Sequence, residues 1–272
     1  MEPPATTRLK LTVHYDGSDF HGWQLQPDRR TVQGELESCL SRLADSPRRV
    51  TGSGRTDTGV HATGQVASVD MPERWTPADL HGSLNAVLAH DVWIESVETV
   101  GDDFHARYDA VARTYTYHIG TSPAAASPFR RRWCWPLGEE PDRRLLRAAT
   151  AVIVGEHSFR AFCKAGQSER GDRCAVASAA WTDSDDGVAL AITADRYLHH
   201  MVRYLVGTTV AIARGRRPLD DMARLLGGDP DVVTSPPAPA QGLFLRRVEY
   251  PIRAAPDIES QPQTTTRSAA PA

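Results

Sequence analysis

Hydrophobic residues recur along the chain with two periods, one typical of strands and one typical of helices. Leu9, Leu11 and Val13 alternate with polar neighbours, which predicts a half-buried strand. Apolar residues at helical spacing over 32–43 predict a helix that begins near Thr31. Alternation and many β-branched or aromatic residues predict further strands at 65–69, 92–97, 113–119, 174–181, 188–193 and 243–250.

Prolines, cap residues and glycines mark the ends of further helices. Thr76 and Pro77 are a typical cap and first-turn proline, so a helix is expected from residue 77. Pro141 is expected to begin another helix, with Gly155 as its C-terminal stop. Two more helices are expected in the second half of the chain, at 199–214 and 219–226.

The order of these elements predicts an α/β (α+β) protein built from two similar halves. Residues 8–120 are expected to form an N-terminal α/β half, and residues 121–252 a C-terminal α/β half. The polar residues 1–7 and the Pro- and Thr-rich residues 253–272 have the composition of disordered segments. The catalytic or binding residues are therefore expected within residues 8–252.

Composition narrows the class of protein. Hydrophobic residues make up 40% of the chain, yet no apolar run is long enough to span a bilayer, and the N-terminus lacks a secretory pattern. We therefore expect a cytoplasmic protein with no membrane partner. The four cysteines form no C-x-x-C pair, which argues against a zinc site and a disulfide framework.

The net charge of −3 does not by itself indicate a nucleic-acid binder, because binding to phosphates needs local positive charge. Almost all of the positive charge comes from arginine, since Lys10 and Lys164 are the only lysines. A basic cleft on a mildly acidic protein is compatible with these numbers.

The densest polar segment is 53–64, SGRTDTGVHATG, which has no apolar periodicity and predicts a loop between strands. Asp57 lies in its middle, between glycines that allow tight turns and close approach of a ligand. Two interpretations follow from the residues alone. Asp57 is either a structural turn residue or a reactive carboxylate.

The motifs around this loop, in their order, resemble the tRNA pseudouridine synthase A family. Those in the first half are Tyr15-Asp16-Gly17, Gly22-Trp23-Gln24, Thr31-Val32-Gln33, Gly54-Arg55-Thr56-Asp57, Gly59-Val60-His61-Ala62 and Gly64-Gln65-Val66. Those further on are Asp103-Phe104-His105-Ala106-Arg107, Arg113-Thr114-Tyr115-Thr116-Tyr117, His199-His200-Met201-Val202-Arg203, Val206-Gly207 and Ala238-Pro239-Ala240-Gln241-Gly242-Leu243. The resemblance extends over residues 8–250, so it is more specific than any single motif.

The resemblance implies two RRM-like halves with antiparallel sheets flanked by helices around a central basic cleft. It implies a homodimer that binds tRNA, not DNA, and converts uridine to pseudouridine at positions 38, 39 and 40 of the anticodon stem-loop. It also implies that no metal or organic cofactor is needed.

By resemblance, the catalytic residues are Asp57, Tyr115 and Arg203. Asp57 would be the nucleophile, Tyr115 would stack on the target base, and Arg203 would keep the carboxylate charged. The residues expected to bind substrate or RNA are Arg55, Thr56, Thr58, Gly59, His61, Arg107, Arg113, His199 and His200. Without the resemblance, Tyr115 would be interpreted as a sheet residue and Arg203 as a surface arginine. Arg55 would be interpreted as a phosphate contact or as a solvent-facing loop residue.

Adjacent His199 and His200 invite a metal-binding interpretation. Neighbours on a helix point in different directions, and no acidic residue follows at i+4, so the sequence predicts no metal site. The segment 130–135, with three arginines between aromatic residues, is interpreted either as a track for an RNA backbone or as a solvated charge run.

Three other functions compete with the synthase. Asp57-Thr58-Gly59 is also the aspartic protease triplet, but the chain has no second copy to share a proton. A non-catalytic RNA-binding protein and a paralogue that modifies another RNA remain as alternatives. Thr58 stands where the family usually has alanine, and 164–172 is hard to align, which leaves the choice of substrate open.

Overall fold

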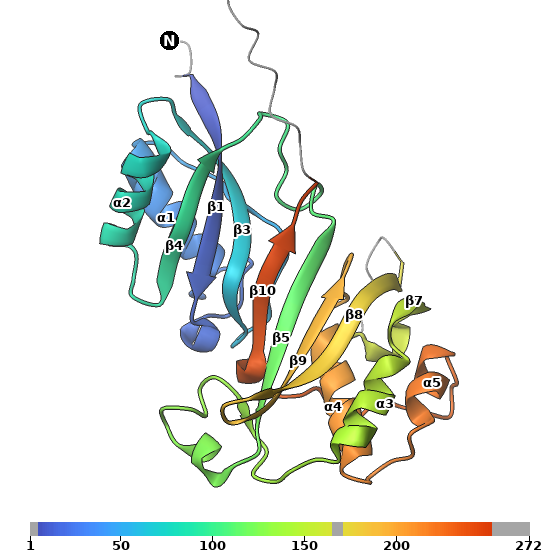
Figure 1. Ribbon diagram of the computed structural model, residues 1–272. Coiled ribbons are helices and arrows are strands. Elements are labelled where there is room, and N and C mark those ends of the chain that lie inside the picture. The colour runs from blue at the N-terminus through green and yellow to red at the C-terminus, as the bar shows by residue number, and fades with distance from the viewer. Residues whose placement is uncertain (1–4, 165–170, 252–272) are drawn as a thin grey trace, which may run out of the picture.

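A computed structural model describes residues 5–164 and 171–251, so the predicted tail and most of the segment 164–172 lie outside the described residues. Ten strands form one sheet with the order β4-β1-β3-β10-β5-β9-β8-β7, in which β2 also pairs with β3, and β6 with β5 (Figure 1). The strands are β1 (Thr6–Tyr15), β2 (Thr51–Gly52), β3 (His61–Pro72), β4 (Val92–Thr99), β5 (Ala112–Gly120), β6 (Trp135–Pro136), β7 (Gly155–Ser158), β8 (Arg173–Ser184), β9 (Gly187–Ala194) and β10 (Leu243–Glu249).

The strand β10 joins the two halves of this sheet. β10 lies between β3 and β5, parallel to β3 through two residue pairs and antiparallel to β5 along most of its length. The other long strands pair antiparallel with their neighbours. The α+β class is confirmed, with the antiparallel strands of both halves continuous in one sheet.

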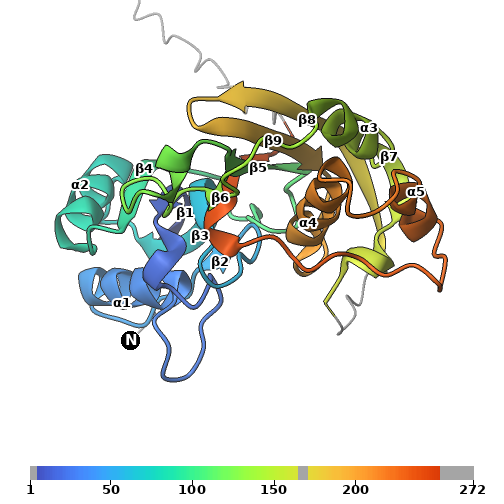
Figure 2. The same ribbon diagram turned by 90° about the horizontal axis from the view of Figure 1, so that it is seen from below.

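The five α-helices of the described residues pack on one side of the sheet. The view from below shows them on that side, with the other face largely open (Figure 2). α1 (Val32–Ala44) and α2 (Pro77–Val87) lie under the strands of the first half, while α3 (Arg143–Ala151), α4 (Met201–Ala213) and α5 (Asp221–Leu226) lie under the second. None of the helices among the described residues is both long enough and apolar enough to cross a membrane.

The alternation predicted for the first strand places its apolar residues toward the helices. Leu9, Leu11 and Val13 are fully buried in the core. Their neighbours point to the open face, where Lys10 contacts Glu98 at 2.9 Å. Burying one side chain of this size stabilises the fold by about 1.5–3 kcal/mol, so the strand fixes its own register.

Both helix starts predicted from threonine caps are confirmed. The Thr31 hydroxyl accepts from the Gly34 N–H at 3.2 Å at the start of α1. The Thr76 hydroxyl accepts from the Asp79 N–H at 3.2 Å, with Pro77 in the first turn of α2. Each cap satisfies an N–H group that a helix leaves without an intrahelical partner.

The prediction for the third helix is wrong at both ends. α3 begins at Arg143 rather than Pro141, because the Asp142 carboxylate caps it by accepting from two backbone N–H groups at 2.8 and 3.0 Å. α3 ends at Ala151, and Gly155 opens β7 with a φ of 112° rather than ending a helix. Asp142 was the stronger N-terminal signal.

The segment 53–64 is only partly a loop. Its last four residues begin β3, since Ala62 pairs with Tyr15 and Thr63 with His14. The predicted loop is therefore wrong from residue 61 onward. Asp57 is left in a short connection between β2 and β3, where ladder hydrogen bonds hold both ends.

The segment before β10 runs closely between α4 and β5. A Cβ atom on Gly207 of α4 would lie 2.1 Å from the Pro236 carbonyl oxygen, so only glycine fits there. The Ala238 N–H donates to the Arg203 carbonyl at 2.9 Å, and the Tyr117 hydroxyl donates to the Pro239 carbonyl at 2.7 Å. These contacts fix the first turns of α4 against the centre of the sheet.

We expect Gly207→Ala to destabilise the fold by about 1–3 kcal/mol, because its Cβ would displace the backbone at Pro236. The matched control is Gly82→Ala in α2, where a Cβ meets nothing within 4 Å and helix propensity predicts a gain of about 0.5–1 kcal/mol. Urea unfolding of the two variants measures both effects. Equal stabilities would contradict this account of Gly207.

Candidate active site

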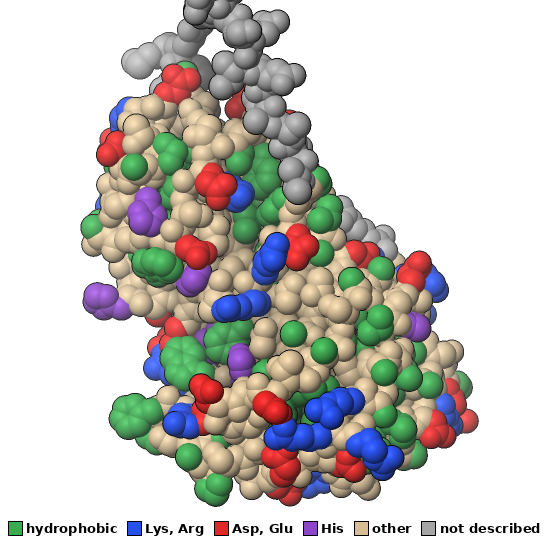
Figure 3. Space-filling view, viewed as in Figure 1, with side chains coloured by type: hydrophobic (Ala, Val, Ile, Leu, Met, Phe, Trp, Pro, Cys, Tyr) green, Lys and Arg blue, Asp and Glu red, His purple; other side chains and the backbone are tan. Residues whose placement is uncertain are grey.

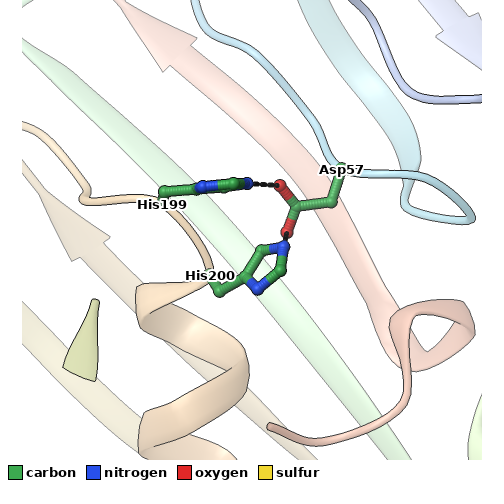
Figure 4. A group of neighbouring side chains, drawn as sticks. All are labelled: Asp57, His199 and His200. Carbon is green, nitrogen blue, oxygen red and sulfur yellow. Dashed lines mark ion pairs between the residues drawn. The ribbon is translucent and has the colours of Figure 1, made fainter. Parts of the chain in front are cut away.

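Asp57 lies where the loop before β3 meets the start of α4. Its Oδ1 is 3.4 Å from His199 Nε2, and its Oδ2 is 3.3 Å from His200 Nε2 (Figure 4). Arg203, one turn into α4, brings Nη1 within 3.6 Å of the same Oδ2. About 20% of the Asp57 side chain stays exposed, so a carboxylate among basic groups remains reachable from solvent.

The chain before α1 braces the Asp57 loop from outside. The backbone N–H of Trp23 donates to the Thr56 carbonyl at 3.1 Å, and the backbone N–H of Gly59 donates to the Phe20 carbonyl at 3.4 Å. Gly22 has a φ of 83°, and a Cβ there would lie 2.6 Å from the Thr56 carbonyl oxygen. The backbones on either side therefore approach too closely for a side chain at Gly22.

A buried polar network holds the loop from beneath. The hydroxyls of Tyr15 and Thr56 share a hydrogen bond of 2.8 Å. The Ser53 hydroxyl donates to Gln65 Oε1 at 2.7 Å, and Gln65 Nε2 donates to the Gly54 carbonyl at 2.9 Å. Thr56, expected to bind RNA, thus directs its hydroxyl into the protein. Since buried polar groups are costly to leave unpaired, the network gives the loop one conformation.

The helix predicted from about His199 begins later, because α4 starts at Met201 and His200 is its N-cap, with a φ of 66°. The expectation that the two histidines point in different directions, on which the prediction of no metal site rested, is therefore wrong. The left-handed backbone at His200 turns its ring toward the ring of His199, and the ring centroids are 4.1 Å apart. Both imidazoles therefore reach the same carboxylate.

Asp57, His199 and His200 are also the group that the described residues offer as a candidate for holding a metal ion, with ligand atoms within 4.8 Å of one another. The Arg203 guanidinium is 3.6 Å from the shared carboxylate. A divalent cation held by these three side chains would face that fixed positive charge at short range, which disfavours its binding.

Arg203 is held in place by the segment before β10. Its Nε donates to the Ala238 carbonyl at 2.8 Å, while its own carbonyl accepts from the Ala238 N–H. One edge of the guanidinium is thereby occupied, and the other faces Asp57. The pair inferred from the sequence resemblance is brought together by the structure.

Tyr115 lies in β5 beneath the site, 8% exposed, with its ring edge-on to Tyr197 at 4.9 Å. Burial raises the pKa of the Tyr115 phenol well above its usual value, and the negative charge of Asp57 adds to the rise. The phenol therefore keeps its proton at neutral pH. It is suited to contact a base with its ring or to donate through its hydroxyl rather than to accept a proton.

The Arg113 guanidinium donates to backbone carbonyls of the surrounding segments. Its Nη1 donates to the carbonyls of Ala110 and Asp195, at 3.1 and 2.9 Å. Its Nη2 donates to those of Ser53 and Arg107, at 2.9 and 2.8 Å. All four terminal N–H groups are directed at backbone, so this arginine links the base of the Asp57 loop to the end of β9.

His61 is equally enclosed. It is 1% exposed, its Nδ1 accepts from the Gly17 N–H at 3.0 Å, and its ring stacks on Phe244 at 4.6 Å. Burial lowers the pKa of His61, which keeps the imidazole neutral. The side chain supports the start of β3 and β10 and does not lie on the surface.

The remaining predicted residues stay accessible. Arg55 and Thr58, on either side of Asp57, are exposed, and Arg107 is exposed with its guanidinium 5.8 Å from the Tyr108 ring. Gly59 has a φ of 77°, which turns the loop into β3. The Arg55 side chain is therefore accessible from solvent.

The arginines around 130–132 are largely matched by acids. Arg130 forms an ion pair with Asp186, and Arg132 contacts Asp16 at 2.7 Å. Their charge is partly neutralised within the protein. This arrangement favours the solvated charge run over a track for RNA.

Sequence reasoning missed the groups that support the loop, namely Tyr15, Ser53 and Gln65, and the backbone at Ala238 that holds Arg203. Gly17 and Gly22 carried a usable signal, because a Cβ on either would lie within 2.6 Å of the loop backbone. Two glycines of this kind near a polar cluster indicate that another segment packs against that cluster.

Known proteins are similar to this chain over most of its length. The family model described as tRNA pseudouridine synthase matches residues 11–109 and 149–251. A tRNA pseudouridine synthase A from Solidesulfovibrio magneticus is 39% identical over 272 residues, covering 97% of this chain and 98% of that protein. Proteins of the same name are 39% identical in Dictyoglomus turgidum, over 90% of this chain and 100% of theirs, and 40% identical in Frankia casuarinae, over 90% and 89%.

The chain belongs to the tRNA pseudouridine synthase family, a class of isomerases that act on tRNA. The matched ranges include both Asp57 and Arg203. Within this class the chain is similar along most of its length to the proteins named tRNA pseudouridine synthase A, which confirms the resemblance found in its motifs.

We expect Arg113→Met to lower the free energy of unfolding by about 2–3 kcal/mol, because four backbone carbonyls lose a charged donor. The control Arg107→Met, at an exposed position nearby, is expected to change it by less than about 0.5 kcal/mol. Urea unfolding measures both. A stable Arg113→Met protein with weakened tRNA binding would instead make Arg113 an RNA contact.

Proposed function

We propose that this protein isomerises uridine to pseudouridine at positions 38, 39 and 40 of the tRNA anticodon stem-loop, with Asp57 as the catalytic nucleophile. The observation that carries this proposal is the position of Asp57. Its carboxylate is contacted by His199, His200 and Arg203, and about one-fifth of the Asp57 side chain remains exposed to solvent. Since the substrate is tRNA, we also propose a cytoplasmic location.

The reaction needs one carboxylate and no redox step. The bond from C1′ to N1 breaks, the uracil turns, a bond forms from C1′ to C5, and the proton on C5 leaves while N1 gains one. An ionised Asp57 serves this sequence either by adding to the base or by stabilising positive charge at C1′. Both routes use the same side chain in the same place.

The neighbouring residues suit the handling of a uridine taken out of its stack. Arg55 is exposed two residues before Asp57, and its guanidinium is suited to occupy the space that the base leaves. Tyr115 lies beneath the carboxylate with a protonated phenol, suited to contact the base or the sugar. The positive charge of Arg203 in α4 favours an approaching phosphate backbone.

Tritium release tests the reaction and its carboxylate together. With anticodon stem-loop RNA labelled at uracil C5, the wild-type protein is expected to release tritium, because the new carbon–carbon bond expels that hydrogen. Asp57→Asn should lower the rate at least about 1000-fold, as loss of a nucleophile does. The control Asp45→Asn, at the exposed C-cap of α1, should release tritium at the wild-type rate.

Other outcomes separate the alternatives. Release from other RNAs but not from this stem-loop would identify a paralogue with another substrate. Tight, salt-sensitive binding without release from any RNA would leave a binding protein on the fold of an enzyme. Release that persists in Asp57→Asn would remove Asp57 from the catalytic role.

We also propose that the protein acts as a homodimer, and that the open face of the second half is the contact surface. Neighbouring positions of β5, β9 and β8 form three rows on this face, in which His118 is the one side chain that is not small: Thr114, Thr193 and Ser178; Thr116, Ala191 and Ala180; His118, Ala189 and Thr182. Over β9 and β8 the surface carries few charged groups (Figure 3). We call these rows the small-residue face.

The first half of the same open face is different and serves as an internal comparison. There Arg8 pairs with Asp70, and Lys10 with Glu98, at 2.7 and 2.9 Å, as expected where a sheet faces water. The small-residue face has no charge to desolvate and no positive group for RNA. A second copy packed across a two-fold axis would meet the same uncharged surface.

Ala191→Arg, in the middle row, is therefore expected to convert a dimer to a monomer in sedimentation velocity runs, because it would bury two unpaired charges at the axis. Ser96→Arg, on the first half of the open face beside Glu98, is the matched control and should leave the dimer intact. Dimers of equal strength in both variants would place the contact elsewhere.

A further inference from the structure

The two histidines before α4 lie outside the buried core. The His199 side chain is 51% exposed and that of His200 is 18% exposed, and neither belongs to the buried core. What they share is Asp57, since each imidazole Nε2 faces a different oxygen of its carboxylate (Figure 4). A carboxylate contacted at both oxygens has a defined direction as well as a defined place.

The backbone at His200 is strained in a way that serves this contact. Among the described residues, three other than glycine have a positive φ, and the other two are Asp28 and Asp45, the latter an exposed helix cap. A left-handed conformation costs an L-residue roughly 1–2 kcal/mol. At His200 the same turn aims the ring at Asp57 as the chain enters α4, and strain of this kind is typical of functional positions.

The contacts are also looser than hydrogen bonds. At 3.3 and 3.4 Å they exceed the usual N–H···O range, so the imidazoles orient the carboxylate without closing it off. Catalytic contacts often have this geometry in the free enzyme and tighten when substrate is bound. Arg203, whose Nε is bonded to Ala238, supplies the fixed charge behind them.

We propose that His199 and His200 are positioning residues, which aim the Asp57 carboxylate at the incoming nucleotide, and that protonation of His200 restrains the carboxylate. This inference rests on the proposed reaction and adds residues that determine its rate. It differs from an RNA-binding role, in which the same histidines would contact phosphate and would not orient the Asp57 carboxylate.

The charge around His200 defines the expected pH dependence. The charged and titratable groups that act on it are Asp57, His199, Arg203 and Lys164. Burial lowers the pKa of His200, the positive neighbours lower it further, and Asp57 acts in the opposite direction. At neutral pH the ring is neutral. As the pH falls it becomes a cation that binds the carboxylate more tightly, so kcat should fall on the acid side.

Two substitutions at His200, both of which place an L-residue in the same left-handed conformation, separate the contact with Asp57 from the titration of the ring. In His200→Gln an amide can still contact Asp57 but cannot titrate. We therefore expect kcat to stay within about tenfold of wild type and no longer to decrease as the pH falls. In His200→Leu the contact is absent, so kcat should drop about 100-fold while KM changes less than about threefold. The control His157→Gln, in β7, should match wild type in both constants.

The result that overturns the proposal is a KM increase with an unchanged kcat in His200→Leu, which would make the histidine an RNA contact. An acid fall that persists in His200→Gln would exclude His200 as its origin. A loss of activity explained by loss of folded protein in urea unfolding would also count against positioning.

A measurement without RNA keeps this test separate from that of the proposed function. The ring C–H signals of His199 and His200 are followed against pH by NMR in the wild-type protein and in Asp57→Asn. Removing the Asp57 charge should lower the pKa of His200, whereas the signals of His157 should not change. An unchanged His200 titration would show that the imidazole does not contact the carboxylate, even if tritium release is normal.

Discussion

The site depends on one pairing of strands, the insertion of β10 between β3 and β5. The parallel contact with β3 consists of two residue pairs, Phe244 with His61 and Leu245 with Ala62. β3 follows directly from the Asp57 loop, and β10 follows directly from the segment that holds Arg203. The strand pairing therefore brings the carboxylate and the guanidinium together, and neither half of the chain contains the complete site.

Much of the fold was visible in the sequence because its signals are local. The caps at Thr31 and Thr76, and the alternation around Leu11, are decided by neighbouring residues and by burial on one face. The α3 boundaries were missed because Pro141 and Gly155 were weighted above the Asp142 cap. The start of β3 was missed because its pairing with β1 outweighs a loop-like composition, and composition carries no information on pairing.

Only part of the candidate site could be predicted from the sequence. The resemblance implied that Arg203 and Asp57 meet, although they are far apart in the sequence. It could not distinguish polar residues directed outward from those directed inward, as at Thr56, His61 and Arg113. Such residues share motifs with the catalytic group because they hold its loop in place, so their presence in a motif says little about contact with RNA. The histidine pair depended on a single left-handed residue, which no periodicity reveals.

The position of β10 also has a consequence for the order of assembly during synthesis. Arg246 of β10 donates to Thr63 of β3 across a separation of 183 residues, so the contact belongs to the slowest class of native interactions to form. Strands β1, β3 and β4 can pair while the rest of the chain is still being translated, but β3 then exposes an unpaired edge. The nascent protein must keep that edge from joining other chains until β10 emerges, and the two parts of the site meet only after that step.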